Sequence, residues 1–495
     1  MFARRSLVLT LFVLCGAAAP GVAEAQLTIR QVEWGFGGRA LAGSFTPVSI
    51  ELDNPTSEAF DGEVRLYRAD YLGNRRGAVL KEQLYISPTN RKRVQFYVIP
   101  LSNRETWRLE AVPEGGTTDE GLSETLPAPG FSNPQGPTVV LLTPQDDFTS
   151  RTPGLPRMNE EIFPIRPEAT DGLAGVVLDH APEWGEPRQD SFLAWLNAGG
   201  VVHLLVSPDG DPVRFGGALT VLNDPSSRFP VGRGLVFRHA RQAGDVTKSF
   251  VKDALTADPT FAGMSTEDFQ FEERRLKQAG LAINFDPTRL EDEILPTLRR
   301  MVRPEHNWGL IHILCLAYVA AIFPGVFLVG RERRGYPATL GLLIAVTLMF
   351  GVALRTVGRR GYGESLSVRT TALVKALPPG PGSEKGVVEV TQWADAFVTN
   401  GGDYTFAVPG DAALYSTGQA AEPVKGTIDN GIGDNGVVGS LTADVPPFSS
   451  RAFVAKARRN EPAPPVQLLA GSAGTTSDGS GIRLNGLRVQ IPEEI

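Results

Sequence analysis

Residues 308–354 read WGLIHILCLAYVAAIFPGVFLVG, RERRGY and PATLGLLIAVTLMFGVAL, and the rest of the chain is arranged around them. Residues 307–329 contain no Lys, Arg, Asp or Glu, and at about 1.5 Å of rise per residue a helix of this length crosses a hydrocarbon core of roughly 30 Å. Residues 337–354 are also uncharged and reach the lower end of the spanning range. The sequence therefore predicts transmembrane helices at 307–330 and 337–354, joined by a short basic tip at 331–336.

The N-terminus has the parts of a secretory signal peptide. An Arg-Arg pair precedes an apolar core, and a small-x-small cleavage pattern ends at Ala25. A lipid anchor at Cys15 is the alternative, but the bulky Leu14 before it fits a lipidation site badly. We therefore expect residues 1–25 to be a signal peptide.

The expected signal peptide also orients the hairpin. Basic residues lie on both flanks of the hairpin as well as at its tip, so charge alone does not decide the orientation. Long domains cross a membrane largely regardless of their charge, and the signal is therefore the better guide. We expect an inner (cytoplasmic) membrane protein with a cytoplasmic tip at 331–336 and both large parts on the extracytoplasmic side.

Charge and cysteine content exclude several classes of protein. The formal charge is −7, and loss of Arg4, Arg5 and Glu24 with the signal peptide removes a net +1 and leaves −8. An acidic chain of this kind lacks the basic face that nucleic-acid binding needs. The two cysteines are Cys15 and Cys315, so the mature chain has no intramolecular disulfide and no thiol nucleophile outside the membrane helices.

The first exported region has the pattern of antiparallel strands. Short runs that alternate between apolar and polar residues occur at 48–52, 63–67, 83–86 and 93–98, with turn residues between them. This pattern predicts a β-sandwich over 26–112. The residues that follow are rich in Gly, Pro, Ser and Thr, which indicates a linker at 113–135.

The second exported region has the pattern of a parallel sheet. The apolar runs at 138–142, 175–178 and 201–206 do not alternate, as in strands that are covered on both faces. Between the last two, residues 189–198 have helical spacing and end at a Gly-Gly pair, which suits a helix C-terminus. We therefore predict a doubly wound α/β domain over 136–303, with a further strand at 235–237 and mostly helical structure from 248 onward.

The region after the hairpin is again β-rich. Strand-like runs at 387–390, 404–408 and 452–455 are separated by Gly and Asp turns. They predict a second β domain over 361–457, followed by a Pro- and Gly-rich tail at 458–495 with a partial β segment. The overall expected fold class is multidomain α/β plus all-β with two transmembrane helices.

This order of parts resembles a group of uncharacterised bacterial membrane proteins, in which the α/β domain is similar to class I glutamine amidotransferases. The resemblance rests on the domain order, on the phrase FLAWLNAGG at 192–200 and on the Pro304–Trp308 entry into the hairpin. The enzymes carry a Cys on the sharp turn after a central strand. Here that turn is Ser207-Pro208-Asp209-Gly210, so the resemblance implies a degenerate domain without amidotransferase chemistry. Ser207 is a poor replacement, because no G-x-S-x-G pattern surrounds it.

Acidic residues follow each predicted parallel strand. They are Asp146 and Asp147, Asp179, and Asp209 with Asp211. Ligands of open α/β sheets bind at the carboxyl ends of strands, and carboxylates there suit Mg²⁺ or Ca²⁺. The alternative is that Asp is a common turn residue in such loops. We expect the second interpretation to hold, with no catalytic residues and no cofactor, since no P-loop, G-x-G-x-x-G or H-E-x-x-H spacing occurs.

Two functions from different classes remain. The first is a non-catalytic, membrane-anchored binding or scaffold protein of the cell envelope, whose partner is another envelope protein. The second is an envelope hydrolase that uses the acidic strand ends. Short tethers on both sides of the hairpin favour the first, because they hold the α/β and C-terminal β domains at an effective concentration of about millimolar. We therefore expect these two domains to pack together, and small residues such as Gly341 and Gly351 to bring the two membrane helices close.

Overall fold

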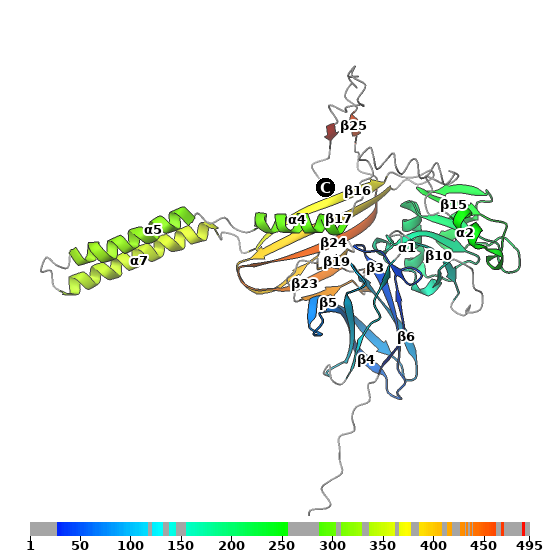
Figure 1. Ribbon diagram of the computed structural model, residues 1–495, viewed down its shortest axis with the longest axis horizontal. Helices are drawn as coiled ribbons and strands as arrows, with labels where there is room; N and C mark the ends of the chain where they lie inside the picture. The colour runs from blue at the N-terminus through cyan, green and yellow to red at the C-terminus, as the bar shows by residue number, and fades with distance from the viewer. Residues whose placement is uncertain are drawn as a thin grey trace, which may run out of the picture.

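The computed structural model describes residues 27–116, 121–131, 138–144, 155–255, 287–302, 308–328, 336–361, 366–377, 386–407, 413–417, 426–430, 432–433, 436–437, 439–461, 467–469 and 488–490. The protein is rich in β-structure and has two apolar helices of membrane length. In Figure 1 these helices lie side by side and project from a body made of sheets. The expected signal peptide, and residues 331–335 of the expected tip, lie outside the described residues.

The largest sheet joins strands from both ends of the chain, in the order β18-β23-β20-β5-β4-β7-β8. The N-terminal strands are β4 (Phe60–Ala69), β5 (Arg75–Ile86), β7 (Thr106–Pro113) and β8 (Leu122–Thr125). The C-terminal strands are β18 (Gly402–Phe406), β20 (Gly426–Asp429) and β23 (Ser440–Val445). The expected linker at 113–135 is wrong in part, because β8 pairs with β7 and satisfies its backbone groups there.

Two smaller sheets cover this one. The first has the order β1-β3-β6, with β1 (Thr28–Trp34), β3 (Thr46–Asp53) and β6 (Arg91–Val98). The second has the order β16-β17-β24-β19, with β16 (Leu366–Leu377), β17 (Gly386–Val398), β24 (Ser449–Glu461) and β19 (Leu414–Ser416). The rings of Trp34 and Trp107 meet edge to face at 5.9 Å under the first sheet, and those of Phe406 and Phe453 meet at 4.8 Å under the second.

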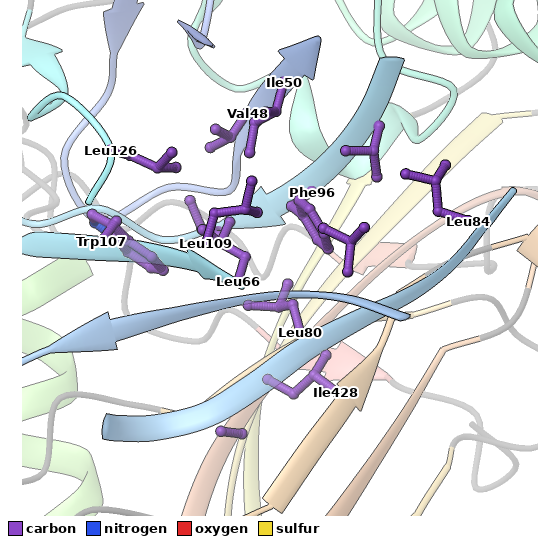
Figure 2. Packing of buried hydrophobic residues seen from close by; sticks show 14 of the residues in the cluster. Val48, Ile50, Leu66, Leu80, Leu84, Phe96, Trp107, Leu109, Leu126 and Ile428 are labelled. Atoms are coloured by element: carbon purple, nitrogen blue, oxygen red, sulfur yellow. The ribbon is translucent and has the colours of Figure 1, made fainter. Parts of the chain in front are cut away.

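The two sandwiches meet at a seam between β5 and β20. These strands run parallel, with Thr427 opposite Val79 and Ile428 opposite Leu80. Figure 2 shows Ile428 close to Leu80, within a cluster that also holds Leu66 and Phe96. One hydrophobic core therefore includes residues from both ends of the chain, and the β-rich region expected over 361–457 completes the N-terminal sandwich.

The parallel strands and the helices around them form a separate part of the protein, which we call the α/β body. It contains a six-stranded sheet in the order β11-β10-β12-β13-β15-β14. Its strands are β10 (Thr138–Thr143), β11 (Arg157–Asn159), β12 (Leu173–Leu178), β13 (Val201–Leu204), β14 (Arg228–Val231) and β15 (Gly234–Arg238). All neighbouring pairs are parallel except β14 with β15. The predicted parallel pairing of this region is confirmed.

Helices cover both faces of this sheet. Helix α1 (Glu186–Asn197) packs Phe192, Trp195 and Leu196 on one face, and α2 (Lys248–Ala254) lies on the other with Phe250. The Gly-Gly pair ends α1 as expected, since Gly199 has a φ of +121°. A Cβ on Gly200 would lie 2.6 Å from the Trp195 ring, so this close approach requires glycine. Short 3₁₀ helices complete the body: η2 (Glu160–Ile162), η3 (Pro167–Ala169), η4 (Gly217–Asn223) and η5 (Ala243–Asp245).

Helix α4 (Pro287–Val302) was assigned by its position in the sequence to the α/β domain, and this assignment is wrong. Its residues Leu295 and Leu298 pack against Trp393 of β17 and Val454 of β24. Arg299 also forms an ion pair with the buried Asp395, at 3.6 Å. The helix lies across β16 and β17 in Figure 1. The apolar face of α4 is thus buried on the C-terminal sheet.

The two long apolar helices are α5 (Trp308–Ala320), which continues as a π-helical turn η6 (Ala321–Val326), and α7 (Tyr336–Gly361). Spans of 18 and 19 residues in them are apolar enough to cross a membrane, and almost none of their side chains is buried. The π-helical turn contains Pro324, which cannot donate a backbone hydrogen bond. Contact between the helices includes Tyr318 and Phe350, with ring centroids 5.4 Å apart.

The expectation that Gly341 and Gly351 mediate this contact is wrong, since no atom lies within 4 Å of the position of a Cβ on either. Three short strand pairs complete the described residues: β2 (Arg39–Ala40) with β9 (Gly130–Phe131), β21 (Ile432–Gly433) with β22 (Gly436–Val437), and β25 (Gln467–Leu469) with β26 (Arg488–Gln490).

Candidate functional site at the carboxyl edge of the parallel sheet

The strand order of the parallel sheet defines where a ligand of this fold class would bind. From β10 the chain first adds β11 on one side and then β12 on the other. The strand order therefore reverses between β10 and β12. In open α/β sheets this switch point, at the carboxyl ends of the strands, is the usual ligand position.

A histidine held between two carboxylates lies at this edge. His180 follows β12, and its Nδ1 lies 2.7 Å from Oδ1 of Asp179. Its Nε2 lies 2.9 Å from Oε2 of Glu160, which belongs to η2 after β11. The side chains of His180, Asp179 and Glu160 are 20%, 18% and 10% exposed. His180 thus connects the ends of β11 and β12, the two strands that flank β10.

The surroundings set the charge of this histidine. Burial alone lowers the pKa of His180, but the hydrogen bonds and charges of Asp179 and Glu160 outweigh burial and raise the pKa to about 9. His180 is therefore protonated at neutral pH, and both ring nitrogens donate hydrogen bonds. An imidazolium in this state is a fixed positive charge between two carboxylates and does not accept a proton at pH 7.

The position of Glu160 is fixed by its neighbours. The Asn159 side chain accepts a hydrogen bond from the backbone N–H of Glu161 and so caps η2. The indole N–H of Trp184 donates to the backbone carbonyl of Glu160 at 2.9 Å. The Trp184 ring in turn packs 4.9 Å from that of Phe163. A packed aromatic cluster therefore holds the backbone of Glu160 in place.

The structure brings together few of the acids that the sequence singled out. Asp179 lies at the switch point, whereas Asp146 and Asp147 lie outside the described residues. Asp209 and Asp211 lie in an exposed turn, in which the backbone N–H of Asp211 donates to the Ser207 hydroxyl. Within the described ranges, no group of three or more His, Cys, Asp or Glu side chains is arranged to hold a metal ion.

The structure also shows the surroundings of Ser207 and of His203. Ser207 belongs to the same turn, where its carbonyl accepts a hydrogen bond from the N–H of Gly210, and no helix begins there. His203 is fully buried in β13, and its Nδ1 lies 3.1 Å from Nε2 of His239. His203 is therefore a core residue.

Sequence reasoning identified Asp179 but not its partners. Glu160 lies nineteen positions earlier (179 − 160) on a 3₁₀ turn, and no spacing rule connects the two residues. A usable signal was the adjacency of Asp179 and His180 directly after a buried strand. Asp179 and His180 indicated the correct edge of the sheet. The second carboxylate, that of Glu160, was recognisable only from the fold.

A second polar cluster joins the α/β body to the C-terminal sheet. Arg458 of β24 donates to the Pro167 carbonyl at 2.7 Å and to the Glu389 carboxylate at 2.6 Å. Its backbone N–H donates to Glu168, and Lys456 beside it forms an ion pair with Asp171. We call these five charged residues, Lys456, Arg458, Glu389, Glu168 and Asp171, the ionic junction.

The two cations of the ionic junction are almost fully buried. The side chains of Lys456 and Arg458 are both 6% exposed. Burial raises the pKa of Glu389, but Lys456 and Arg458 outweigh burial and lower it to about 2. The same carboxylates raise the pKa of Arg458 against the opposite effect of burial. The expected packing of the α/β body against the C-terminal β region is confirmed by these contacts.

A polar cavity of about 460 Å³ opens at the seam between β5 and β20. Its lining includes Glu63, Lys81, Glu82, Asp429 and Thr442. Lys81 and Glu63 form an ion pair at 3.1 Å. Burial raises the pKa of Glu82 to about 7, since nearby Lys92 compensates burial only in part and Asp429 adds to the rise. Glu82 is therefore partly protonated at neutral pH.

Comparison with known proteins gives one family match. A domain of unknown function (DUF8726) matches residues 28–124, from the start of β1 into β8. The match includes the first residues of the stretch expected as a linker, which supports β8 as part of the N-terminal sandwich. No curated protein matches the sequence.

Three solved structures show limited similarity. A cycloisomaltooligosaccharide glucanotransferase from Paenibacillus sp. is 13% identical, with 36% of this chain and 27% of that one covered and a TM-score of 0.18. The alkylpurine DNA glycosylase AlkC from Pseudomonas fluorescens is 10% identical, with 21% and 30% covered and a TM-score of 0.15. A β-D-mannosidase from Dictyoglomus thermophilum is 16% identical, with 40% and 26% covered and a TM-score of 0.15. The chain thus spans less than a third of each, and such scores carry no argument about fold or function.

Proposed function

We propose that the protein is a non-catalytic, membrane-anchored scaffold of the bacterial cell envelope that binds another envelope protein. The observation that carries the proposal is that sequence-distant parts form one body. The N-terminal strands share a sheet and a core with the C-terminal strands, and the ionic junction joins the α/β body to the same C-terminal sheet. A body of fixed shape next to a membrane suits the presentation of a binding surface.

Helix α4 supports this proposal. It is packed on the C-terminal sheet through Leu295, Leu298 and the Arg299–Asp395 ion pair. Only the five residues 303–307 separate its end from α5. On the other side, four residues separate α7 from β16. Tethers of this length keep the body at the membrane surface, where its effective concentration for a membrane partner is high.

The location belongs to the same proposal. The expected signal peptide and the two apolar helices support a body outside the cytoplasmic membrane and a tip inside it. The resemblance to bacterial membrane proteins with a degenerate amidotransferase-like domain agrees with this arrangement, and the parallel sheet with α1 and α2 on opposite faces supports that part of it.

Cysteine labelling tests the location. In a background in which Cys15 and Cys315 are replaced, we expect Tyr71→Cys and Phe448→Cys to react with an impermeant thiol reagent in spheroplasts, because both side chains are highly exposed. Gly335→Cys should react only after lysis. Reaction at position 335 and protection at 71 and 448 would invert the topology.

Crosslinking in native membranes tests the scaffold. The full-length protein should capture a reproducible partner, and Arg458→Ala should reduce the capture because it releases the α/β body from the C-terminal sheet. Arg65→Ala is the matched control, since it removes one partner of the more exposed Arg65–Glu63 pair. No capture above background by the wild type, or equal capture by Arg458→Ala, would contradict the proposal.

The site at His180 supports a second candidate, an envelope hydrolase. Asp179, His180 and Glu160 lie at the switch point of the sheet, where such enzymes bind ligands. Two carboxylates at this edge are a partial ligand set for Mg²⁺ or Ca²⁺. We favour the scaffold because His180 already occupies one oxygen of each carboxylate.

Calorimetry separates the two candidates. The full-length protein in detergent should show no Mg²⁺ or Ca²⁺ binding tighter than about millimolar, the weak end of known sites. The full chain is required, because a fragment ending at residue 303 would expose the face of α4 that packs on β17 and β24. A micromolar site that Asp179→Ala abolishes would promote the hydrolase.

A further inference from the structure

The edges of the sheets differ in how well they are protected against pairing with another chain. An exposed edge strand presents unpaired backbone N–H and C=O groups, and proteins usually shorten, bend or charge such edges. Here β8, β11, β14, β18 and β19 have at most five residues, and β14 contains Pro230. Strand β1 has an irregular register between Ile29 and Gln31. Strand β6 begins with the charged residues Arg91, Lys92 and Arg93.

Strand β16 is neither short nor irregular, and two separate cations are its one protection. It has 12 residues and pairs with β17 without a break, from Leu366 opposite Val398 to Leu377 opposite Val387. Among the described residues no strand pairs with its other side. It contains no proline, and its two cations lie six positions apart, at Arg369 and Lys375.

Apolar side chains gather on the same strand. Leu366, Val368, Leu373 and Val374 are between 40% and 44% exposed. The other exposed large apolar side chains of the described body are dispersed over separate elements: Tyr71, Leu72, Tyr85, Val221, Met301 and Phe448. Helix α4 packs Leu295 and Leu298 against β17 and β24 and also lies against β16, yet these four side chains of β16 stay exposed. Within the described part of the chain, the edge therefore combines unpaired backbone groups with exposed apolar surface.

We propose that β16 is the docking edge of the scaffold, and that an extended segment of another envelope protein adds to it as a further strand. This inference rests on the scaffold function proposed above and names the surface that performs it. Only an extended chain satisfies the row of backbone groups along β16 and places alternate side chains on its apolar residues.

The charges of β16 define the chemistry of the added segment. Arg369 and Lys375 flank the uncharged run Thr370–Val374, and β16 contains no acidic residue. A matching strand has β-branched or other apolar residues at its centre and carboxylates near both ends of the contact. Opposite charges across a strand pair stabilise it and exclude basic segments. Because β16 begins five positions after α7 ends (366 − 361), the partner is held near the membrane.

Site-specific photo-crosslinking in native membranes tests the register. A photoreactive amino acid is placed in turn at Val368, Thr370, Ala372 and Val374 of the full-length protein. Strand addition predicts that all four positions crosslink to one partner segment, and that the partner residue moves by two for each step of two. The same probe at Val221, an exposed apolar residue of the α/β body, should not reach that segment.

Charged variants test the energy of the contact. Val368→Lys with Val374→Lys should reduce capture by about tenfold or more, because Lys on an edge strand opposes pairing. Val221→Lys is the matched control and should retain capture. Unchanged thermal unfolding of both proteins shows that the fold is intact.

Each other outcome overturns the inference. Crosslinks to partner residues spaced by three or four indicate a helix, and crosslinks of the protein to itself indicate a second copy. Absence of crosslinks at all four positions, or unchanged capture by the Lys variant, shows that β16 is not the docking edge. The scaffold function survives these results if the wild type still captures a partner that Arg458→Ala loses, so the two proposals fail separately.

Discussion

The seam and the ionic junction hold the body together by different physics. At the seam, Ile428 and Leu80 are buried on paired strands, and the adjoining core is apolar. At the ionic junction, the side chains of Arg458 and Lys456 are buried among three carboxylates. Burial of apolar area tolerates small changes in geometry, whereas a buried charge is favourable only when its partners are all present.

This difference indicates which of the two contacts tolerates substitutions, the seam, and which depends on particular residues, the ionic junction. The C-terminal strands extend the N-terminal sandwich by apolar contact and backbone pairing, as in any sheet. The α/β body, by contrast, is positioned by this charge pattern together with a small apolar cluster in which Ala169 packs with Tyr97 and Leu414. The next three predictions test this comparison in order of expected effect.

The largest effect should come from Arg458→Ala. It leaves the buried Glu168 and the partly exposed Glu389 and Asp171 with only Lys456 to compensate them, and loss of one partner of a buried ion pair costs up to about 3–5 kcal/mol. We expect faster hydrogen exchange in η3 and at the facing end of β24, measured by mass spectrometry. The control Arg65→Ala should cost less than about 1 kcal/mol. Equal exchange in both variants would show that the ionic junction does not hold the α/β body.

Ile428→Ala should have a similar or smaller effect at a different place. Removing a buried Ile side chain costs about 2–5 kcal/mol, including the cavity that remains. Hydrogen exchange should rise in β5 and β20 but not in η3. The effect should be independent of salt because no charge is involved. Val221→Ala, at an exposed position, is the control. A loss of protection in η3 as large as that in β5 would mean that the two joints are one cooperative unit.

The smallest effect should come from Glu82→Gln beside the cavity. The pKa of Glu82 is raised from 4.5 to about 7 in the folded protein, so ionisation opposes folding. The wild type should therefore lose stability as pH rises from 4.5 through 7, and the variant should lack this loss. We expect a gain of about 1–3 kcal/mol at pH 8 and no gain at pH 4. Thermal unfolding across this pH range measures it. Equal stability of the two proteins at pH 8 would contradict the raised pKa.

Much of the local structure was predictable from the sequence, but its assembly was not. The buried strands β10, β12 and β13 were recognisable because apolar runs such as Thr138–Leu142 do not alternate. Strand β20 was missed, since it has four residues of which only Ile428 is buried. Its pairing with β5 depends on contact with a distant segment. Helix α4 was recognised as helical, but an amphipathic pattern does not identify the surface that its apolar face covers.

The same limit applies to the candidate site. Asp179 was placed correctly because it follows a parallel strand, and every such strand ends at the same edge. Asp209 and Asp211 follow the same rule but lie in a turn, which is closed by backbone hydrogen bonds and by the Ser207 hydroxyl, which accepts from the Asp211 N–H. Glu160 could not be identified, because the 3₁₀ turn that presents it follows a strand of three residues.

The shared sheet has a consequence for the order in which the protein is made. Leu80 pairs with Ile428, which is 348 positions later (428 − 80), and the two long apolar helices lie between them in the sequence. At about 5–20 residues per second, a ribosome needs roughly 20–70 s to make this stretch. During that interval, the edge of β5 that later pairs with β20 is without this neighbour, while both apolar helices are made. Closure of the seam is therefore a late step, and a nascent chain arrested before residue 426 would carry an unpaired strand edge that favours misassembly.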